Sequence, residues 1–141
     1  MAELNEYVYD WFCFANQDLA SAEHLLSLHP QPLEVICYLC EQAVEKYLKG
    51  FLIFHGSQQP PKTHELDRLC ELCTVHDDRF SEIMKACLVL TDYGVQPRYP
   101  HEMYIEERHV HKALEYARQV KAFAPLAALW SKGKDGAGEG G

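Results

Sequence analysis

The sequence predicts an all-α fold, an up-and-down antiparallel bundle of four to five helices. Two observations predict it. Long stretches of the chain place apolar residues at intervals of three and four, the spacing of one face of an α-helix, and nothing reads as a strand. The connections between these stretches are short, and helices with short connections pack as antiparallel neighbours.

The first predicted helix covers residues 3–28, and Asp18 lies at the edge of its apolar stripe. An acid in this position is typical of a hydrogen-bonded group at the border of a core. The stripe consists of Leu4, Val8, Trp11, Phe12, Ala15, Leu19, Ala22 and Leu26.

The second predicted helix, residues 32–56, has an apolar stripe and also an unusual second face. Gly56 is expected to end the helix, because glycine is favoured just beyond the last turn. The stripe contains Leu33, Cys37, Cys40, Val44, Tyr47, Leu48 and Phe51, and the mixed face contains Tyr38, Gln42, Lys46, Lys49 and Ile53. A helix with one apolar face normally turns its other face to water. The second face of this helix also carries large apolar groups, so we expect the helix to contact something on both sides.

Two further helices follow, and then the pattern breaks. Thr63 is the expected N-cap of a third helix, and the fourth extends from about Arg79 to Asp92. The expected buried residues are Leu66, Leu69, Cys70 and Cys73 in the third helix and Phe80, Ile83, Met84, Cys87 and Leu88 in the fourth. The proline-containing segment 93–104 excludes regular helix, and a last helix is predicted over residues 106–129.

Composition indicates one folded domain, residues 1–130, and a flexible glycine-rich tail, residues 131–141. The apolar fraction of 48% is typical of a soluble globular protein that needs no metal or disulfide to form its core. Apolar runs are far shorter than 18 residues and the N-terminus is acidic, which argues against a membrane span or signal peptide. We therefore expect a cytoplasmic protein.

Six cysteines raise the question of a metal site. Cys37 with Cys40 and Cys70 with Cys73 have the C-x-x-C spacing, but the pairs lie too far apart for a zinc ribbon. Both pairs lie within helical periodicity, so packing in the core is favoured over metal binding. A metal or haem bundle built on the eight scattered histidines is the less favoured alternative, and no cofactor is expected.

The net charge of −8 belongs wholly to the first third of the chain. Residues 1–45 contain eight acids and no Lys or Arg, whereas the remainder carries equal numbers of each sign. This balance argues against a broad nucleic-acid-binding surface, because phosphate contacts supply most non-specific affinity. A small basic pocket remains compatible with it.

Four ordered patches resemble the HEPN domain, the higher eukaryotes and prokaryotes nucleotide-binding domain. They are DLASAEHLL (18–26), QAVEKYLKG (42–50), THEL (63–66) and RYP (98–100). The resemblance covers roughly residues 10–125 and implies an all-α bundle that commonly forms homodimers beside a minimal nucleotidyltransferase. Some members are metal-independent endoribonucleases of toxin–antitoxin or defence systems that use an Arg followed by four to six residues and a His. Others lack this motif and act as accessory or binding domains.

No arginine in this chain has that spacing. After four, five and six intervening residues Arg98 is followed by Met103, Tyr104 and Ile105, and only two residues separate Arg98 from His101. An accessory protein that binds a nucleotide or RNA with a minimal nucleotidyltransferase is therefore favoured. A metal-independent endoribonuclease with a displaced Arg98 and His101 pair is the alternative, since His and Arg can supply the base and the cation for RNA cleavage.

The same residues suggest a ligand-binding site. Arg98 is suited to a bidentate phosphate contact and the neighbouring tyrosines to stacking on a base. The candidate ligand-binding residues are Arg98, Tyr99, His101, Tyr104, His64, Lys46 and Lys49. The structural alternative is that Arg98 anchors its loop to the carboxylate of Asp18 or Glu41. A homodimer with the mixed face of the second helix at its interface is also expected.

Overall fold

The computed structural model describes residues 4–94 and 104–139, with side chains described as far as residue 132, and confirms an all-α helical bundle. Its α-helices are α1 (Glu6–His24), α2 (Leu33–Phe54), α3 (Leu66–His76), α4 (Met84–Leu90), α5 (Glu107–Ala122) and α6 (Ala124–Glu139). The described residues also form three 3₁₀ turns, namely η1 (Leu25–Ser27), η2 (Asp78–Ile83) and η3 (Thr91–Tyr93). None of the described helices combines the length and apolar character needed to cross a membrane.

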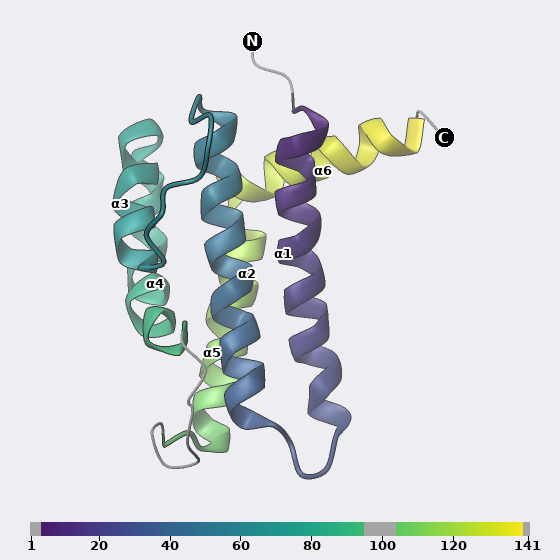
Figure 1. Ribbon diagram of the computed structural model, residues 1–141, viewed down its shortest axis with the longest axis vertical. Coiled ribbons are helices and arrows are strands. Elements are labelled where there is room, and N and C mark those ends of the chain that lie inside the picture. Colours follow the sequence, from purple (N-terminus) through teal and green to yellow (C-terminus); the bar gives the residue numbers. More distant parts are fainter. Residues whose placement is uncertain (1–3, 95–103, 140–141) are drawn as a thin grey trace.

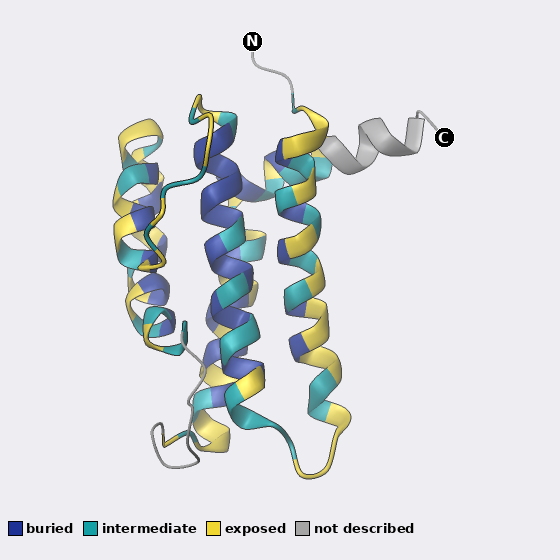
Figure 2. Ribbon diagram, in the orientation of Figure 1, coloured by how far each residue is buried: buried dark blue, intermediate teal, exposed yellow. Residues whose placement is uncertain are grey.

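Helix α2 is the central element of the bundle. It packs between α1 and the α3–α4 pair, with α5 behind it, while α6 crosses one end of α1 (Figure 1). Figure 2 shows buried residues along most of α2, whereas α1 and α3 are buried along one side. The α2 stripe that the sequence predicts is buried, except for half-buried Leu33 at its start.

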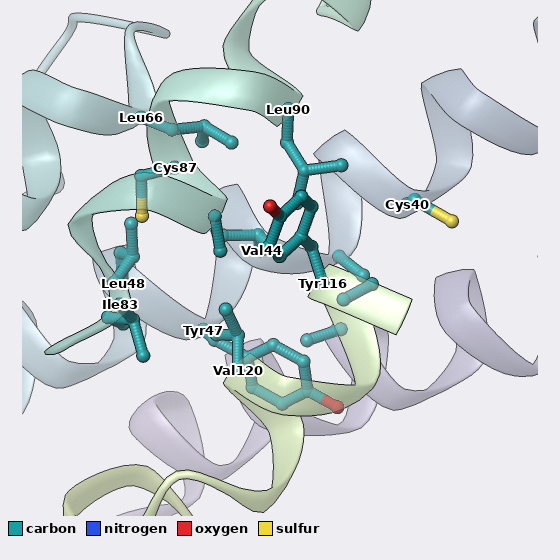
Figure 3. Close-up of a cluster of buried hydrophobic side chains, with 14 of the residues drawn as sticks. Cys40, Val44, Tyr47, Leu48, Leu66, Ile83, Cys87, Leu90, Tyr116 and Val120 are labelled. Carbon is teal, nitrogen blue, oxygen red and sulfur yellow. The ribbon is translucent and has the colours of Figure 1, made fainter. Parts of the chain in front are cut away.

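The buried core side chains of the described residues come from all six α-helices and from η2. Val44, Tyr47 and Leu48 of α2 lie among apolar side chains of α3, η2, α4 and α5 (Figure 3). The Tyr47 hydroxyl donates to the Asn16 side chain of α1, so the buried ring keeps a hydrogen-bond partner. Each fully buried Val, Leu, Ile or Phe side chain of the core stabilises the fold by about 1.5–3 kcal/mol relative to an exposed one.

The cysteines of both C-x-x-C pairs are buried in this core. Burial raises the pKa of Cys37 and of Cys40 to about 12, so both remain neutral thiols at physiological pH. Within the described residues, no three His, Cys, Asp or Glu side chains converge in a way that could hold a metal ion. The thiols therefore act as small apolar side chains in the packing.

Helices α2 and α3 run in the same direction, so the bundle departs from strict alternation at this step. His55, just after α2, and His76, the last residue of α3, stack with ring centroids 4.8 Å apart. The segment 57–65 runs back along α2 before α3 begins (Figure 1). This returning segment covers part of the α2 surface.

Gly56 ends α2 as predicted. Its φ of 111° lies in the left-handed region that favours glycine, and its N–H donates to the Ile53 carbonyl at 3.1 Å. The Ser57 N–H donates to the Leu52 carbonyl at 3.2 Å, which completes a Schellman motif.

The predicted N-cap of α3 is wrong. The helix begins at Leu66, and the Thr63 hydroxyl accepts from the Glu65 N–H at 3.2 Å in the loop before it. The Leu66 N–H instead donates to the hydroxyl of Thr91, at 3.0 Å, from η3. A residue 25 positions away thus supplies the cap.

The predicted burial of Leu88 is also wrong, since its exposed fraction is 52%. The predicted fourth helix divides into η2, α4 and η3, and Ala86 and Leu90 are buried in α4. A 3₁₀ turn has three residues per turn, so it changes the phase of the apolar stripe that follows. A continuous period of 3.6 residues therefore does not predict which residues are buried beyond η2.

The predicted last helix is two helices, α5 and α6, separated at Phe123, whose backbone is extended. Pro125 has no N–H to donate to the carbonyl of Lys121, four residues earlier. The indole N–H of Trp130 donates to that carbonyl at 3.2 Å. Helix α6 continues past residue 130 to Glu139, and the division of the chain at residue 130 stays a prediction.

Candidate functional site

Three charged residues of α2 lie at the centre of the candidate site. Glu41, Glu45 and Lys49 are spaced by four residues, so they lie along one face of the helix. Their exposed fractions are 0%, 6% and 5%, although charged side chains are rarely buried unless they are paired. Neither glutamate is among the ligand-binding residues that the sequence predicts.

Glu45 has two partners. Its Oε2 lies 3.5 Å from Lys49 Nζ and its Oε1 lies 3.0 Å from His64 Nδ1. His64 comes from the segment 57–65, and its side chain is 76% exposed. The predicted ligand-binding residues Lys49 and His64 are thus brought together by a carboxylate that the prediction did not include.

Glu41 is only partly satisfied. Its Oε2 accepts from Gln42 Nε2 at 2.7 Å, whereas Oε1 has no hydrogen-bond partner among the described residues. Burial, assisted by the nearby Glu45 charge, raises the pKa of Glu41 to about 8, although Gln42 and Lys49 oppose the increase. Glu41 is therefore largely protonated at neutral pH.

Gly94 closes the space beside Glu41. A Cβ on Gly94 would lie 3.1 Å from Glu41 Cδ and 3.2 Å from Oε1, closer than an ordinary van der Waals contact. The backbone φ of Gly94 is −70°, which any residue can adopt. Glycine is favoured here because the carboxyl group occupies the space of a side chain.

Lys46 belongs to a different contact. It donates to Asp18 of α1, and its side chain remains 26% exposed. Lys46 and Lys49, which the sequence placed on one mixed face, therefore pair with acids on different sides of α2. Ile53, from the same predicted face, is 9% exposed, so only part of that face remains accessible.

The predicted residues around the proline-containing loop are only partly placed. Arg98, Tyr99 and His101 lie outside the described residues. Tyr104 is 84% exposed just before α5. The described site therefore consists of Glu41, Glu45, Lys49 and His64, next to the point where the loop leaves Gly94.

The comparisons with known proteins agree with this architecture. The family model of the HEPN domain matches residues 8–126. A solved structure, TT1696 from Thermus thermophilus, is 24% identical with a TM-score of 0.67, and the match covers 91% of this chain and 99% of that chain. A search of curated proteins gave no match. The resemblance predicted from the four sequence patches is confirmed, and the chain belongs to the HEPN domain family.

Proposed function

We propose that this protein is a non-catalytic HEPN accessory protein that binds a nucleotide or RNA together with a minimal nucleotidyltransferase. One observation carries the proposal, namely that no Arg in the chain is followed by a His after four to six residues. Family membership supports the general class of function. We also infer a cytoplasmic location, where the six cysteines would stay reduced.

The ligand would contact the loop that follows Gly94. Arg98 supplies a planar cation for a phosphate, and Tyr99 and Tyr104 supply aromatic rings for a base. His101 and the exposed His64 would add further donors to the ligand. Lys49 acts indirectly, because its ammonium already neutralises Glu45, and Lys46 is likewise paired with Asp18.

Arg98 has a second possible role, as an anchor for its own loop. Of the two acids that the sequence offers, Asp18 is paired with Lys46, whereas one Glu41 oxygen has no hydrogen-bond partner among the described residues. A double-mutant cycle with Arg98→Ala and Glu41→Gln tests the anchor. A coupling free energy of unfolding above about 1 kcal/mol supports the anchor, and additive effects on the free energy of unfolding would exclude it.

RNA cleavage distinguishes the accessory role from that of an endoribonuclease. The purified protein is incubated with total RNA and EDTA, alongside the double variant Arg98→Ala/His101→Ala. We expect both samples to leave the RNA intact, while both retain the fold by circular dichroism. Cleavage by the wild type that the double variant abolishes would establish the endoribonuclease alternative.

We further propose a homodimer whose interface includes Tyr38, Gln42 and Lys46 of α2. These three residues are half-buried in the single chain, whereas Lys49 and Ile53 are already covered. An isologous interface brings this face against itself. Light scattering at micromolar concentration is expected to give twice the mass of the 16.2 kDa chain, and a monomeric mass would exclude the dimer.

A further inference from the structure

A hollow lies between α1 and α2, apart from the candidate site formed by Glu41, Glu45, Lys49 and His64. It has a volume of about 320 Å³ and is lined by Tyr7, Asp10, Trp11 and Phe14 of α1 and by Lys46 of α2. The hollow is partly open to solvent. Its volume is at the lower end of the range for small-ligand pockets, so it suits one side chain rather than an extended ligand.

The three aromatic rings share one face of α1 because they are spaced by four and three residues. Tyr7 is 49% and Phe14 is 54% exposed, so these rings are available to a ligand. Tyr7 meets Trp11 edge to face, with centroids 6.4 Å apart and an interplanar angle of 88°. The rings form one wall of the hollow.

Gly50 of α2 sets the position of this wall. A Cβ at Gly50 would lie 2.9 Å from the Phe12 ring and 3.1 Å from Trp11 Cβ. The absence of a side chain therefore lets α1 approach α2 closely at Trp11. The hollow is fixed by helix packing and not by a loop.

The charge of the hollow is negative. Lys46 is paired with Asp18, so its cation is already neutralised. Asp10 is exposed and forms no ion pair within the described part of the chain, and residues 1–45 contain no Lys or Arg. A phosphate would meet the Asp10 carboxylate without a free cation beside it, whereas a positive group would be attracted.

We propose that this hollow binds the guanidinium group of an arginine from a basic segment of a partner protein. A guanidinium is planar and weakly hydrated, and it stacks on aromatic faces while its N–H groups donate to a carboxylate. Tyr7, Trp11 and Phe14 supply the faces, and Asp10 supplies the carboxylate. The partner is recognised through charge complementarity with the acidic N-terminal third of the chain.

The experiment is an NMR titration of the ¹⁵N-labelled full chain with Nα-acetyl-arginine methylamide. The indole N–H of Trp11 reports on the hollow, and that of Trp130, hydrogen-bonded to Lys121, is the internal control. We expect a saturable shift of the Trp11 signal only. The citrulline analogue, which has the same shape without the charge, should shift it at least fivefold less.

Variants test the two recognition elements separately. Asp10→Asn and Phe14→Leu should each weaken arginine binding at least threefold, while Glu82→Gln, an exposed acid of η2, should leave it unchanged. Equal shifts with arginine and citrulline, or a larger shift with AMP, would overturn the proposal. If Phe14→Leu instead converts a dimer to a monomer, the hollow belongs to a second copy of the chain and the proposal also fails.

Discussion

Glu41 and Glu45 are one helical turn apart on α2, and both are buried, but their surroundings differ. Glu45 meets Lys49 and His64, whereas Glu41 meets Gln42 and the backbone at Gly94. The difference arises from the covering segments, because the segment 57–65 brings a donor to Glu45 and η3 ends in a glycine beside Glu41. Identical residues on one helix thus become an ion pair and a protonated carboxyl group.

Removing the Glu45 carboxylate should change the free energy of unfolding more than any other substitution around these two glutamates. Glu45→Ala leaves the Lys49 ammonium buried without its partner, and we expect a loss of about 3 kcal/mol in the free energy of unfolding. Urea denaturation at pH 7 measures it. Glu45→Ala/Lys49→Met should recover most of the loss, and Glu71→Ala, in an exposed pair with Arg68, should change little. A loss as small as that of Glu71→Ala would contradict the pairing.

The substitution Glu41→Gln should increase the free energy of unfolding, and the size of the increase should depend on pH. The pKa of Glu41 is raised from 4.5 to about 8 in the folded state, so folding takes up a proton between these values. The favourable contribution of protonated Glu41 to stability is complete below pH 4.5 and is lost as the pH rises to about 8. Gln imitates the protonated form, so we expect stabilisation by about 2 kcal/mol at pH 8.5 and little change at pH 5.

Denaturation of wild type and Glu41→Gln at several pH values measures this difference. Glu23→Gln, whose exposed carboxylate pairs with Arg118, is the control and should show no comparable pH dependence. Destabilisation by Glu41→Gln at pH 8.5 would mean that Glu41 is ionised and paired with a cation.

Gly94→Ala tests the shape of the Glu41 environment. The new Cβ would crowd the carboxyl group at 3.1 Å, and we expect a cost of about 1 kcal/mol. In a Glu41→Ala background the crowding is relieved, so the cost of Gly94→Ala should disappear. Thermal or urea denaturation of the four variants gives the coupling, and equal costs in both backgrounds would exclude this contact as the cause.

His64→Ala should have the smallest effect, because the side chain is 76% exposed and Lys49 remains to pair with Glu45. We expect a loss of about 0.5 kcal/mol in the free energy of unfolding at pH 7. His24→Ala, at the exposed end of α1, is the matched control. A loss equal to that of Glu45→Ala would show that His64, and not Lys49, is the main partner of Glu45.

The sequence predicted what depends on local periodicity. The α2 stripe, the Gly56 cap and the all-α bundle follow from spacing and backbone preference within one segment. The predictions failed where distant segments or a change of helix type decide the outcome, as at Leu88 after η2 and at Leu66, which Thr91 caps. The break at Phe123 had a local signal in Pro125 that the sequence analysis did not use.

The candidate site was harder to predict than the fold. The charges of Glu41, Glu45 and Lys49 on an apolar helix were visible, but their burial depends on the returning segment 57–65 and on η3. Periodicity does not contain this information. His64 and Lys49 were named as candidates, and the structure places both at Glu45, while Arg98, Tyr99 and His101 remain candidates outside the described residues.

The hydrogen bond from the Leu66 N–H to Thr91 joins the two segments that cover α2. Leu66 begins the helix that follows His64, and Thr91 begins the turn that leads to Gly94. If one segment moves without the other, this hydrogen bond is stretched or broken. The bond therefore couples the surroundings of Glu45 to those of Glu41. The exchange rate of the Leu66 amide hydrogen is therefore expected to report the opening of either segment beside Glu41 and Glu45.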